Sequence, residues 1–454
     1  MTTSKSTLVY LPDCLQDNLD TVFCVTAQDM ISRRDLFAHA LSISKQLPDK
    51  AYAINLCQNR YFFIVAYLAV VFRNQVSLLP PNQSPRTISD LLTAYADSYC
   101  ITDALVDSQG MSLASADLSF GDPNVFLISN DSLNADMGAL PLIDSNRTIS
   151  ISFTSGSTGK PKAIAKSWRE FQAGAELALQ HFNLIGQAAT LVSTVPAQHM
   201  YGLETSFFWP LFSGLSIHDR RPFYPEDISR CLKSLDRPGI LVSTPAHLKA
   251  CTSVKTIWPA IKSVLSSTAP ISASLAQQVE ATLNAPLYEL FGSTETLSFA
   301  SRRNALSTQW QTYAGVRLWQ QGRHFVVGGG HLHIPIKLDD RFLLHDDQSF
   351  SIVGRSNDLI KIAGKRASLA ELNLILNNID GIDDGLFVHY KNERLSAIVV
   401  SESSRKAILT ELKKSMDPVF LPRIIHFVAE LPRQPTGKVN QSELQDLIQG
   451  LSLV

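Results

Sequence analysis

Strand-like and helix-like stretches alternate through the first third of the chain, and this alternation limits the folds open to it. AYAINL at 51–56 is typical of a short strand, an apolar helix is predicted for Tyr61–Phe72, and SLLPP at 77–81 predicts a strand and its end. A β-prone run, RTISISF at 147–153, precedes a helix predicted for Glu170–His181. Such alternation predicts an open sheet covered by helices. We therefore expect an α/β fold with layered sheets.

Length predicts a second, smaller domain. The 454 residues exceed the roughly 250–300 at which a single core stops growing. The pattern changes near residue 355, after the hairpin strand SFSIVGR at 349–355, and continues with short helices and strands typical of a small α+β domain. We predict a large N-terminal domain over 1–355 and a small C-terminal domain over 356–454. LPRQPTGKVNQSEL at 431–444 is expected to be an exposed tail.

Composition excludes several classes of protein. Forty Lys and Arg residues against 41 Asp and Glu residues, with no long basic run, give no electrostatic basis for nucleic-acid binding. The longest apolar run, Tyr61–Phe72, is shorter than the ~20 residues of a membrane span. The start of the chain lacks the apolar core of a signal peptide, so we expect a cytoplasmic protein. No CxxC pair occurs, and reduced core thiols are expected at Cys14, Cys24, Cys57, Cys100, Cys231 and Cys251.

The most informative segment is ISFTSGSTGKPKAIAKS at 151–167. Small hydroxyl and glycine residues after a strand allow backbone N–H groups and side-chain hydroxyls to converge on phosphate oxygens. A kinase-type loop would require Gly at Thr154 and a hydroxyl residue directly after Lys160, where Pro161 stands. The segment therefore predicts a phosphate loop of another kind. A flexible Ser/Gly surface loop is the alternative.

This segment resembles the signature of the AMP-forming adenylating enzymes, the family of acyl- and aryl-CoA ligases, adenylation domains and luciferases. Further matches follow in order along nearly the whole chain. They are STVPAQHMYGLE at 193–204, SSTAP at 266–270, YELFGSTET at 288–296, SIVGRSNDLIKIAGKR at 351–366 and LPRQPTGK at 431–438. The resemblance implies a large adenylate-forming domain that binds ATP and the acid, and a mobile C-terminal domain that carries a catalytic lysine.

The resemblance also implies residue roles. Lys438, Glu295, Thr294 and His199 would be catalytic, with Mg²⁺ held by Glu295 and Thr158. ATP would contact Thr154, Ser155, Gly156, Ser157, Thr158, Gly159, Lys162, Thr268, Ala269, Pro270, Phe291, Gly292, Ser293, Asp340 and Arg355. The acid pocket would include His199, Ser267, Thr268 and Gly292, and the pantetheine channel Lys361 and Gly364. The hinge between the domains would be Asn357.

Several positions depart from the family pattern. The ribose-binding aspartate normally follows Thr-Gly about fifteen positions before the arginine that matches Arg355. Counting back gives Asp340, but Leu338 and Asp339 replace Thr and Gly, and a solvated turn is the alternative. The hinge residue is usually charged, whereas Asn357 is neutral. Three glycines at 328–330 with two nearby histidines predict a strand end rather than a metal site.

The implied chemistry is attack by a carboxylate on the α-phosphorus of ATP, followed by transfer of the acyl group to a thiol. Lys438 would bridge the two anions as a movable positive charge; an ordinary tail lysine is its alternative. The thiol would belong to coenzyme A or to the 4'-phosphopantetheine arm of an acyl carrier protein. Lys361, Lys365 and Arg366 form a basic run suited to either acceptor, or a merely solvated face.

The expected acid is short and flat. Thr268 stands where glycine is common, and Phe207, Phe208 and Trp209 follow His199 closely, so bulky residues disfavour a long acyl chain. GSTET, Trp310 and GKRASLAELN resemble a compact subgroup of aryl polyene pathways that loads 4-hydroxybenzoate-like acids onto a carrier protein. This chain reads Leu297-Ser298-Phe299-Ala300 where that subgroup reads Gly-Gly-Ile-Ala. The alternative hypotheses are a medium-chain acyl-CoA or acyl-ACP ligase, a phosphate-loop kinase or ATPase, and a non-enzymatic binding or scaffold protein.

Overall fold

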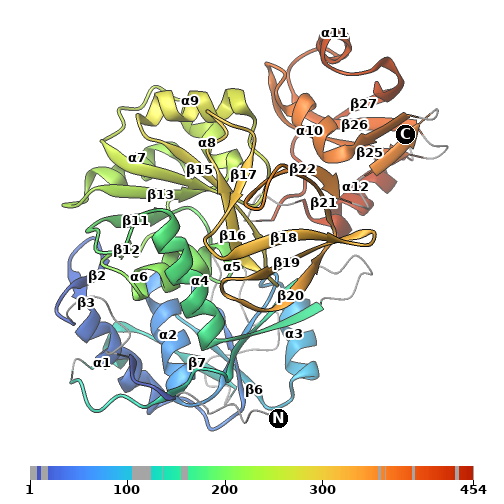
Figure 1. Cartoon of the computed structure of the whole chain (residues 1–454). Helices are drawn as coiled ribbons and strands as arrows, with labels where there is room; N and C mark the ends of the chain where they lie inside the picture. The colour runs from blue at the N-terminus through green and yellow to red at the C-terminus, as the bar shows by residue number, and fades with distance from the viewer. Residues whose placement is uncertain are drawn as a thin grey trace.

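The computed structural model describes residues 8–11, 19–104, 124–134, 136–154, 162–355, 359–362, 365–390, 394–434 and 439–452. It describes only the backbone of Thr154, Arg355, Leu359, Lys361, Lys365, Arg366, Ser368, His389, Tyr390, Arg394, Gln441, Ser442 and Ser452. Most of the described chain forms one large body of helices and sheets, while the C-terminal residues gather at one side of it (Figure 1). The fold is mixed α/β, as the alternating sequence pattern predicts.

The first sheet has six strands, and all but one neighbouring pair run parallel. Strand β9, formed by the β-prone run, pairs parallel with β5 on one side and antiparallel with β10 on the other. In spatial order the strands are β10 (Lys162–Ser167), β9 (Thr148–Thr154), β5 (Val76–Leu79), β4 (Tyr52–Asn55), β6 (Ser98–Thr102) and β7 (Val125–Leu127).

The second sheet has eleven strands, with a parallel centre and antiparallel margins. The parallel strands run from β2 to β15, and the chain then reverses through β16, β17, β22 and β21. In spatial order the strands are β21 (Asp340–Leu344), β22 (Ser349–Arg355), β17 (Trp310–Thr312), β16 (Leu297–Arg302), β15 (Leu287–Ser293), β14 (Ile261–Ser266), β13 (Gly239–Ser243), β11 (Thr190–Ser193), β12 (Ser216–His218), β2 (Val22–Val25) and β3 (Met30–Ser32).

Helices of the large body carry local start signals in the sequence. Ser32 caps α1 and Ser167 caps α4, and in each case an acidic residue three positions later, Asp35 or Glu170, completes a capping box. The apolar helix α2 is buried along almost its whole length, as its sequence predicts. The helices are α1 (Arg33–Ser44), α2 (Arg60–Phe72), α3 (Pro85–Ala94), α4 (Trp168–His181), α5 (Met200–Leu203), the π-helix η4 (Glu204–Phe208), α6 (Trp209–Leu211), α7 (Pro225–Lys233), α8 (Pro245–Thr252) and α9 (Ala273–Leu283).

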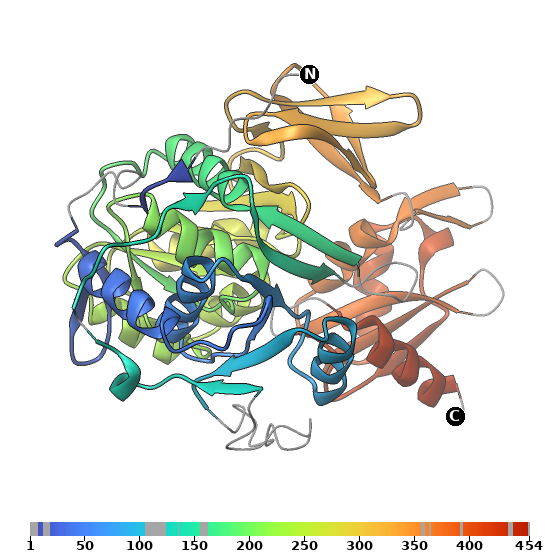
Figure 2. The same cartoon turned by 90° about the horizontal axis from the view of Figure 1, so that it is seen from below.

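Smaller elements complete the large body. A three-stranded antiparallel sheet, β18-β19-β20, projects beside the second sheet, and both views show it as a separate layer (Figures 1 and 2). The glycines at 328–330 end β19, so the predicted strand end is confirmed. These elements are β1 (Leu8–Val9), β8 (Ile143–Asp144), the 3₁₀ turn η3 (Asn130–Ser132), β18 (Val316–Gln321), β19 (His324–Gly329) and β20 (Leu332–Leu338).

The C-terminal residues form a small α+β unit with its own core. Its two hydrophobic clusters draw only on described residues from Ile360 onward, and the clusters of the large body only on described residues up to Ile352. The division at 355/356 stays a proposal. The elements are β23 (Leu359–Ile362), β24 (Lys365–Ser368), α10 (Leu369–Asn377), β25 (Ile382–Tyr390), β26 (Arg394–Ser401), α11 (Arg405–Ser415), η5 (Pro418–Phe420), β27 (Ile424–Phe427) and α12 (Gln441–Ser452).

One expectation about this unit is wrong. The segment predicted as an exposed tail contributes Leu431 and Leu444 to the core, with only 7% and 8% of their surfaces exposed. Gln441 begins α12, whose apolar side chains cover strands β25 and β26. Proline and glycine around residue 435 suggested a continuous loop, but the periodic leucines that follow form a helix.

Two other expectations hold for the described chain. None of its helices combines the length and apolar character needed to cross a bilayer. The five cysteines it includes are free and buried, as predicted, while Cys14 lies outside the described residues.

Candidate active site

The segments singled out in the sequence follow neighbouring strands of the second sheet. His199 comes after β11, Ser267–Pro270 after β14, and the residues around Glu295 after β15. Because these strands are parallel, the segments that follow them emerge at the same edge of the sheet. Ligands of open α/β sheets bind at this edge. The structure therefore brings these candidate residues to one end of the sheet.

The expected phosphate segment reaches the same edge from the first sheet. Thr154 ends β9 and pairs with Lys162, the first residue of β10, while Ser155, Gly156, Ser157, Thr158 and Gly159 lie outside the described residues. The Lys162 ammonium lies 3.3 Å from Glu295 Oε1. The base of the phosphate segment is thus placed against the proposed metal ligand.

Glu295 is half-buried and held in its ionised form. Burial raises its pKa, but hydrogen bonds from its own backbone N–H and the Ser293 hydroxyl, together with Lys162, outweigh burial and leave the pKa below its ordinary value. Among the described residues no group of three metal-ligating side chains occurs. A single carboxylate fits Mg²⁺ bound mainly through phosphate oxygens, since this ion commonly uses one or two carboxylates beside substrate phosphates.

Lys166 is a site residue that the sequence motifs did not single out. Its side chain is only 5% exposed, and its ammonium donates to Glu170 Oε1 at 2.9 Å and to the backbone carbonyl of Glu295. The buried lysine therefore ties β10 to the turn that presents the Glu295 carboxylate. The spacing of Lys166 and Glu170 could have indicated an ion pair, but its contact with residue 295 depends on tertiary structure.

The turn after β15 is tightly packed. A Cβ atom at Gly292 would collide with the carbonyl oxygen of Leu297. The Phe291 ring packs against Phe299 and Trp310, with centroids 5.3 and 5.4 Å away. Gly292 and Ser293 are exposed, and Thr294 is half-buried. The proposed adenine-stacking ring is therefore fixed by an aromatic cluster behind it.

The SSTAP segment contains a strained residue. Thr268 has φ of +80°, a region that β-branched residues rarely adopt. The neighbouring Ser267 hydroxyl donates to the backbone carbonyl of Leu290 at 3.0 Å, which ties the segment to β15. Ala269 and Pro270 are exposed. Thr268 thus adopts a backbone conformation that glycine, which has no side chain, adopts more easily.

Leu297 is a second such residue, at the start of β16. Its φ is +56° and its side chain is buried. A Cβ atom at Gly174 of α4 would lie 2.8 Å from the Leu297 side chain. Gly174 therefore leaves the space that the Leu297 side chain fills.

The ribose-binding prediction falls on paired strands. Asp340 begins β21 and lies opposite Arg355, the last residue of β22. The Asp346–Asp347 pair occupies the turn between these strands. The fifteen positions from Asp340 to Arg355 thus correspond to one hairpin, and its register places these two candidate residues side by side.

The aromatic residues after His199 do not support the argument from pocket bulk. Phe207, Phe208 and Trp209 are fully buried, and Phe208 stacks on Phe171 at 4.1 Å. Their rings pack in the main core between α2 and α4. Bulk beside the acid therefore cannot be inferred from them, because burial in the core explains their size. His199 itself is half-buried and occupies the N-cap position of α5.

The C-terminal candidate residues are only partly described. Lys361 pairs with Arg366 across the β23–β24 hairpin, while Gly364, Asn357 and Lys438 lie outside the described residues. The flanks of the segment that carries Lys438 are anchored. Arg433 pairs with Val439 and donates to Asp384 Oδ1 at 2.6 Å.

Lys249 joins the large body to the C-terminal unit. Its ammonium donates to the carbonyl of Ile382 at 2.7 Å, and to those of Asp383 and Asn377 at 3.3 and 3.4 Å. These carbonyls lie at the end of α10 and the start of β25, next to Asp384. The carbonyls that Lys249 contacts are therefore close in sequence to Asp384, whose ion pair with Arg433 anchors the segment that carries Lys438.

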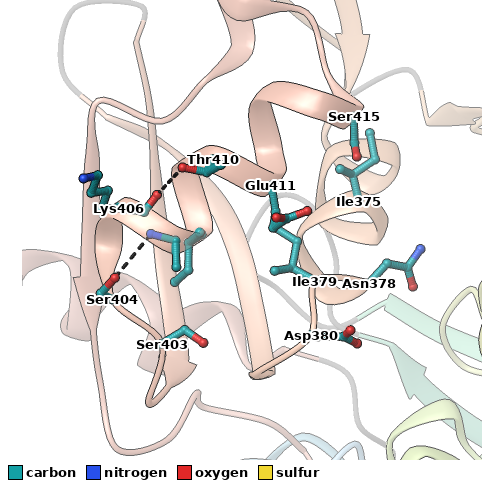
Figure 3. Close-up of a pocket in the computed structure, with 12 residues that line it drawn as sticks. Ile375, Asn378, Ile379, Asp380, Ser403, Ser404, Lys406, Thr410, Glu411 and Ser415 are labelled. Atoms are coloured by element: carbon teal, nitrogen blue, oxygen red, sulfur yellow. Dashed lines mark hydrogen bonds between the residues drawn. The ribbon is translucent and has the colours of Figure 1, made fainter.

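A hollow of about 830 Å³ lies within the C-terminal unit, between the end of α10 and α11 (Figure 3). The Ser404 and Thr410 hydroxyls on its wall form hydrogen bonds within α11 itself. None of the candidate ATP, acid or metal residues lines this hollow. It is separate from the site at the sheet edge.

Comparison with known proteins agrees with this arrangement. The family described as AMP-binding enzyme matches residues 16–322. A putative long chain fatty acid-CoA ligase of Staphylococcus aureus is 25% identical, with 65% of this chain and 70% of that protein covered. A 3-hydroxybenzoate/4-hydroxybenzoate–CoA ligase of Thauera aromatica is also 25% identical, over 65% of this chain and 66% of the relative.

Among solved structures, the anthranilate CoA ligase AuaEII in complex with anthranoyl-AMP aligns with a TM-score of 0.81 and 15% identity. The alignment covers 98% of this chain and 97% of that one. At this identity the similarity establishes the fold, which is the two-domain fold of adenylate-forming enzymes. The family match covers well over half of the sequence. The chain belongs to the AMP-binding enzyme family and is an AMP-forming ligase that joins an acid to a thiol.

Proposed function

We propose that the protein activates an aryl carboxylic acid similar to 4-hydroxybenzoate with ATP and transfers the acyl group to the phosphopantetheine thiol of an acyl carrier protein. The observation that carries the adenylation step is the contact of Lys162 with Glu295, beside the segments that hold His199 and Thr268. The hydroxybenzoate-CoA ligase relative supports an aryl acid. The carrier-protein acceptor rests on the subgroup resemblance of the sequence.

In the first half-reaction, a carboxylate oxygen of the acid forms a bond to the α-phosphorus of ATP, and the bond to the bridging oxygen of pyrophosphate breaks. The carboxylate needs no general base, because it is already ionised at neutral pH. Lys162, the serine- and threonine-rich segment before it and Lys438 would stabilise the charge on the phosphate oxygens. Mg²⁺, when bound by Glu295 and Thr158, would neutralise phosphate charge.

Other candidate residues would position the nucleotide and the acid. Phe291 and the Thr268–Pro270 segment would enclose adenine, and Asp340 with Arg355 would hold the ribose. His199 would lie between the acid and the phosphates. The paired strands β21 and β22 support the ribose assignment, because they place both residues at one position of the sheet.

In the second half-reaction, the thiolate sulfur forms a bond to the acyl carbon, and AMP leaves with the electrons of the acyl–phosphate oxygen bond. The C-terminal domain would rotate about Asn357, withdraw Lys438 and bring Lys361 and Gly364 to the pantetheine channel. The proposed domain boundary at 355/356 is supported by the separate hydrophobic clusters on its two sides.

Coenzyme A as the acceptor is the second candidate function. Relatives named as CoA ligases favour it, among them the hydroxybenzoate ligase and a 4-coumarate–CoA ligase of Rhodobacter capsulatus. This alternative retains every proposed role at the ATP site. The two candidate functions differ in the partner of the basic residues of the β23–β24 hairpin. With CoA these residues would bind its 3'-phosphate, and with a carrier protein they would bind an acidic helix.

Acid-dependent release of pyrophosphate from ATP tests the proposal. The panel contains acetate, octanoate, palmitate, benzoate, 4-hydroxybenzoate and coumarate, with Mg²⁺ present. We expect the aryl acids to give the highest kcat/KM. A preference for octanoate would replace the aryl assignment with a medium-chain acid, and release of phosphate with ADP would contradict adenylation itself. Loading of the preferred acid onto CoA or a phosphopantetheinylated carrier protein then decides the acceptor.

A further inference from the structure

The turn that presents Glu295 leads into a strained residue. Thr294, Glu295 and Thr296 form the turn between β15 and β16. Leu297, the first residue of β16, has φ of +56°, a conformation that a leucine side chain disfavours. Such strain persists only where the surrounding structure holds the backbone in place, and it clusters at functional sites. The contacts that hold this turn therefore bear on the role proposed for Glu295.

Two buried side chains hold consecutive carbonyl groups of the turn. The Lys166 ammonium donates to the carbonyl of Glu295, and His331 Nε2 lies 2.7 Å from the carbonyl oxygen of Thr296. A carbonyl oxygen only accepts hydrogen bonds, so His331 Nε2 carries the proton. The Lys166 side chain is 5% exposed and His331 is 1% exposed. Both hydrogen bonds are therefore shielded from water, which makes each of them costly to lose.

A third buried group, Glu204, holds the chain directly after Leu297. Its Oε2 accepts hydrogen bonds from the backbone N–H and the hydroxyl of Ser298, at 2.9 and 2.7 Å. Burial raises the pKa of this carboxyl to about 7, although the Ser298 hydrogen bonds lower it. A Cβ atom at Gly174 would lie 2.8 Å from the Leu297 side chain and 3.6 Å from the His331 ring, so both pack closely against α4. The strained residue is thus fixed on both of its sides.

Strand β10 contacts Glu295 at both its backbone and its side chain. Lys162 begins β10 and has its ammonium 3.3 Å from the Glu295 carboxylate, while Lys166 on the same strand holds the Glu295 carbonyl. The phosphate segment of the sequence leads directly into this strand. A displaced turn would therefore move the carboxylate relative to the groups proposed to bind phosphate.

We propose that Lys166 and His331 are positioning residues that hold the Glu295 carboxylate where the Mg²⁺ of bound ATP meets it. This role rests on the proposed function, in which Glu295 is the metal ligand. Neither side chain would touch the metal or the nucleotide, because each acts through a backbone carbonyl of the turn. Loss of groups that orient a metal ligand typically lowers metal affinity or activity by ~10–100-fold.

The first test measures ATP binding by calorimetry, with Mg²⁺ and with EDTA, for the wild type, Lys166→Met and His331→Leu. The gain in affinity that Mg²⁺ provides should fall at least ~5-fold in both variants, because the carboxylate remains but is displaced. Binding of metal-free ATP should stay as in the wild type. His331→Gln should restore most of the gain, since its amide N–H can donate to the same carbonyl of Thr296.

A double-mutant cycle asks whether Lys166 acts through Glu295. The Mg²⁺ concentration for half-maximal pyrophosphate release should rise in Lys166→Met, with the KM for the aryl acid unchanged. In the Glu295→Ala background, Lys166→Met should cause no further rise, because the group that it positions is already absent. Effects that multiply in the double variant would overturn the inference.

Lys50→Met is the matched control. The half-buried Lys50 also ties two elements together, since its ammonium donates to the carbonyl of Ser98 at 2.9 Å. It precedes β4 and contacts the first residue of β6, at the amino ends of these parallel strands and away from the site. Lys50→Met should leave the gain from Mg²⁺ unchanged. An equal loss of this gain in Lys50→Met and Lys166→Met would assign Lys166 a structural role only and overturn the inference.

The remaining outcomes separate the inference from the proposed function. An unchanged gain from Mg²⁺ in Lys166→Met and His331→Leu, with a loss in Glu295→Ala, would overturn the inference and leave the proposed function standing. If Lys166→Met does not fold, the comparison of His331→Leu with His331→Gln decides in the same way. No acid-dependent pyrophosphate release by the wild type would overturn the proposed function, while the calorimetry would still test the positioning of Glu295.

Discussion

The ammonium of Lys162 lies 3.3 Å from the carboxylate of Glu295, across the edge where the two main sheets meet. These residues are 133 positions apart in the sequence. Lys162 thus neutralises the charge of the proposed metal ligand in this structure. When ATP and Mg²⁺ bind, the carboxylate would exchange an ammonium partner for a metal ion, and the lysine would become available to phosphate.

Removal of the Glu295 carboxylate should impair the use of metal-bound ATP. In Glu295→Ala we expect the Mg²⁺ concentration for half-maximal pyrophosphate release to rise at least ~10-fold, because one of the few protein ligands is lost. A titration of Mg²⁺ at fixed ATP measures this. Glu226→Ala, at an exposed position of α7, should behave as the wild type. An unchanged metal dependence in Glu295→Ala would contradict the ligand assignment.

Lys438 should matter to only one half-reaction. We expect Lys438→Ala to lower adenylate formation by roughly 10²-fold or more, since it removes a positive charge from the developing oxyanions. Transfer from a supplied acyl-adenylate to the thiol should stay within a few-fold of the wild type. The two rates are measured separately, by pyrophosphate release and by thioester formation. Equal losses in both would reject the proposed role.

Thr268 should be replaceable by glycine with a gain in stability. A non-glycine residue in the left-handed region costs about 1–3 kcal/mol, and glycine loses up to about 1 kcal/mol through chain entropy. Thr268→Gly should therefore raise the free energy of unfolding by about 1 kcal/mol and improve activity toward bulkier acids. Urea denaturation and the acid panel measure both effects.

Asn284→Gly provides the comparison for Thr268. Asn284 also has a positive φ, at the end of α9, but asparagine tolerates this conformation. We expect a smaller change in stability and no change in acid preference. A uniform effect of Thr268→Gly on all acids would mean that Thr268 does not contact the acid.

The contacts of Lys249 should influence the balance between the two half-reactions. They belong to the domain orientation present in this structure, so Lys249→Ala should shift the population away from it. One half-reaction should then accelerate while the other slows. Lys255→Ala changes an exposed lysine shortly after α8 and should alter neither rate. A parallel loss of both rates in Lys249→Ala would indicate simple destabilisation.

Glu204 should make stability depend on pH. Its pKa is raised from 4.5 to about 7, so between these values the folded state holds a proton that the unfolded state releases. Stability must therefore fall as pH rises through this interval and level off above it. Relative to Glu204→Gln, the wild type should lose on the order of 3 kcal/mol between pH 4.5 and 7. Parallel pH profiles of unfolding for the two proteins would contradict the raised pKa.

The sequence predicted those features that depend on local pattern. The alternating apolar runs located α2, β4 and β9 to within a residue or two. Hydrophobic periodicity and helix caps depend only on residues that are close together in the sequence. The fifteen-residue count from Arg355 to Asp340 corresponded to one hairpin, whose register the strands fix. The segments of the family signature follow parallel strands of the second sheet, and this arrangement, which only the structure shows, brings them to one edge.

Features that depend on contacts distant in sequence were missed. Lys166 and Glu204 look ordinary in the sequence, and their burial against Glu295 and Ser298 arises only when the sheets assemble. Core packing also explains Phe208, which the sequence placed beside the acid. Positive φ at Thr268 and Leu297 could not be predicted, because the residues themselves disfavour it and only the surrounding packing maintains it.

Leu297 and Gly174 form a complementary pair with a consequence for engineering this enzyme. A library that varies residue 297 alone would mostly sample damaged proteins, because a smaller side chain leaves a void against α4 and a larger one has no room. Alanine at position 174 is compatible only with a side chain smaller than leucine at position 297. The two positions should therefore be randomised together, as one coupled site whose members come from different layers of the fold.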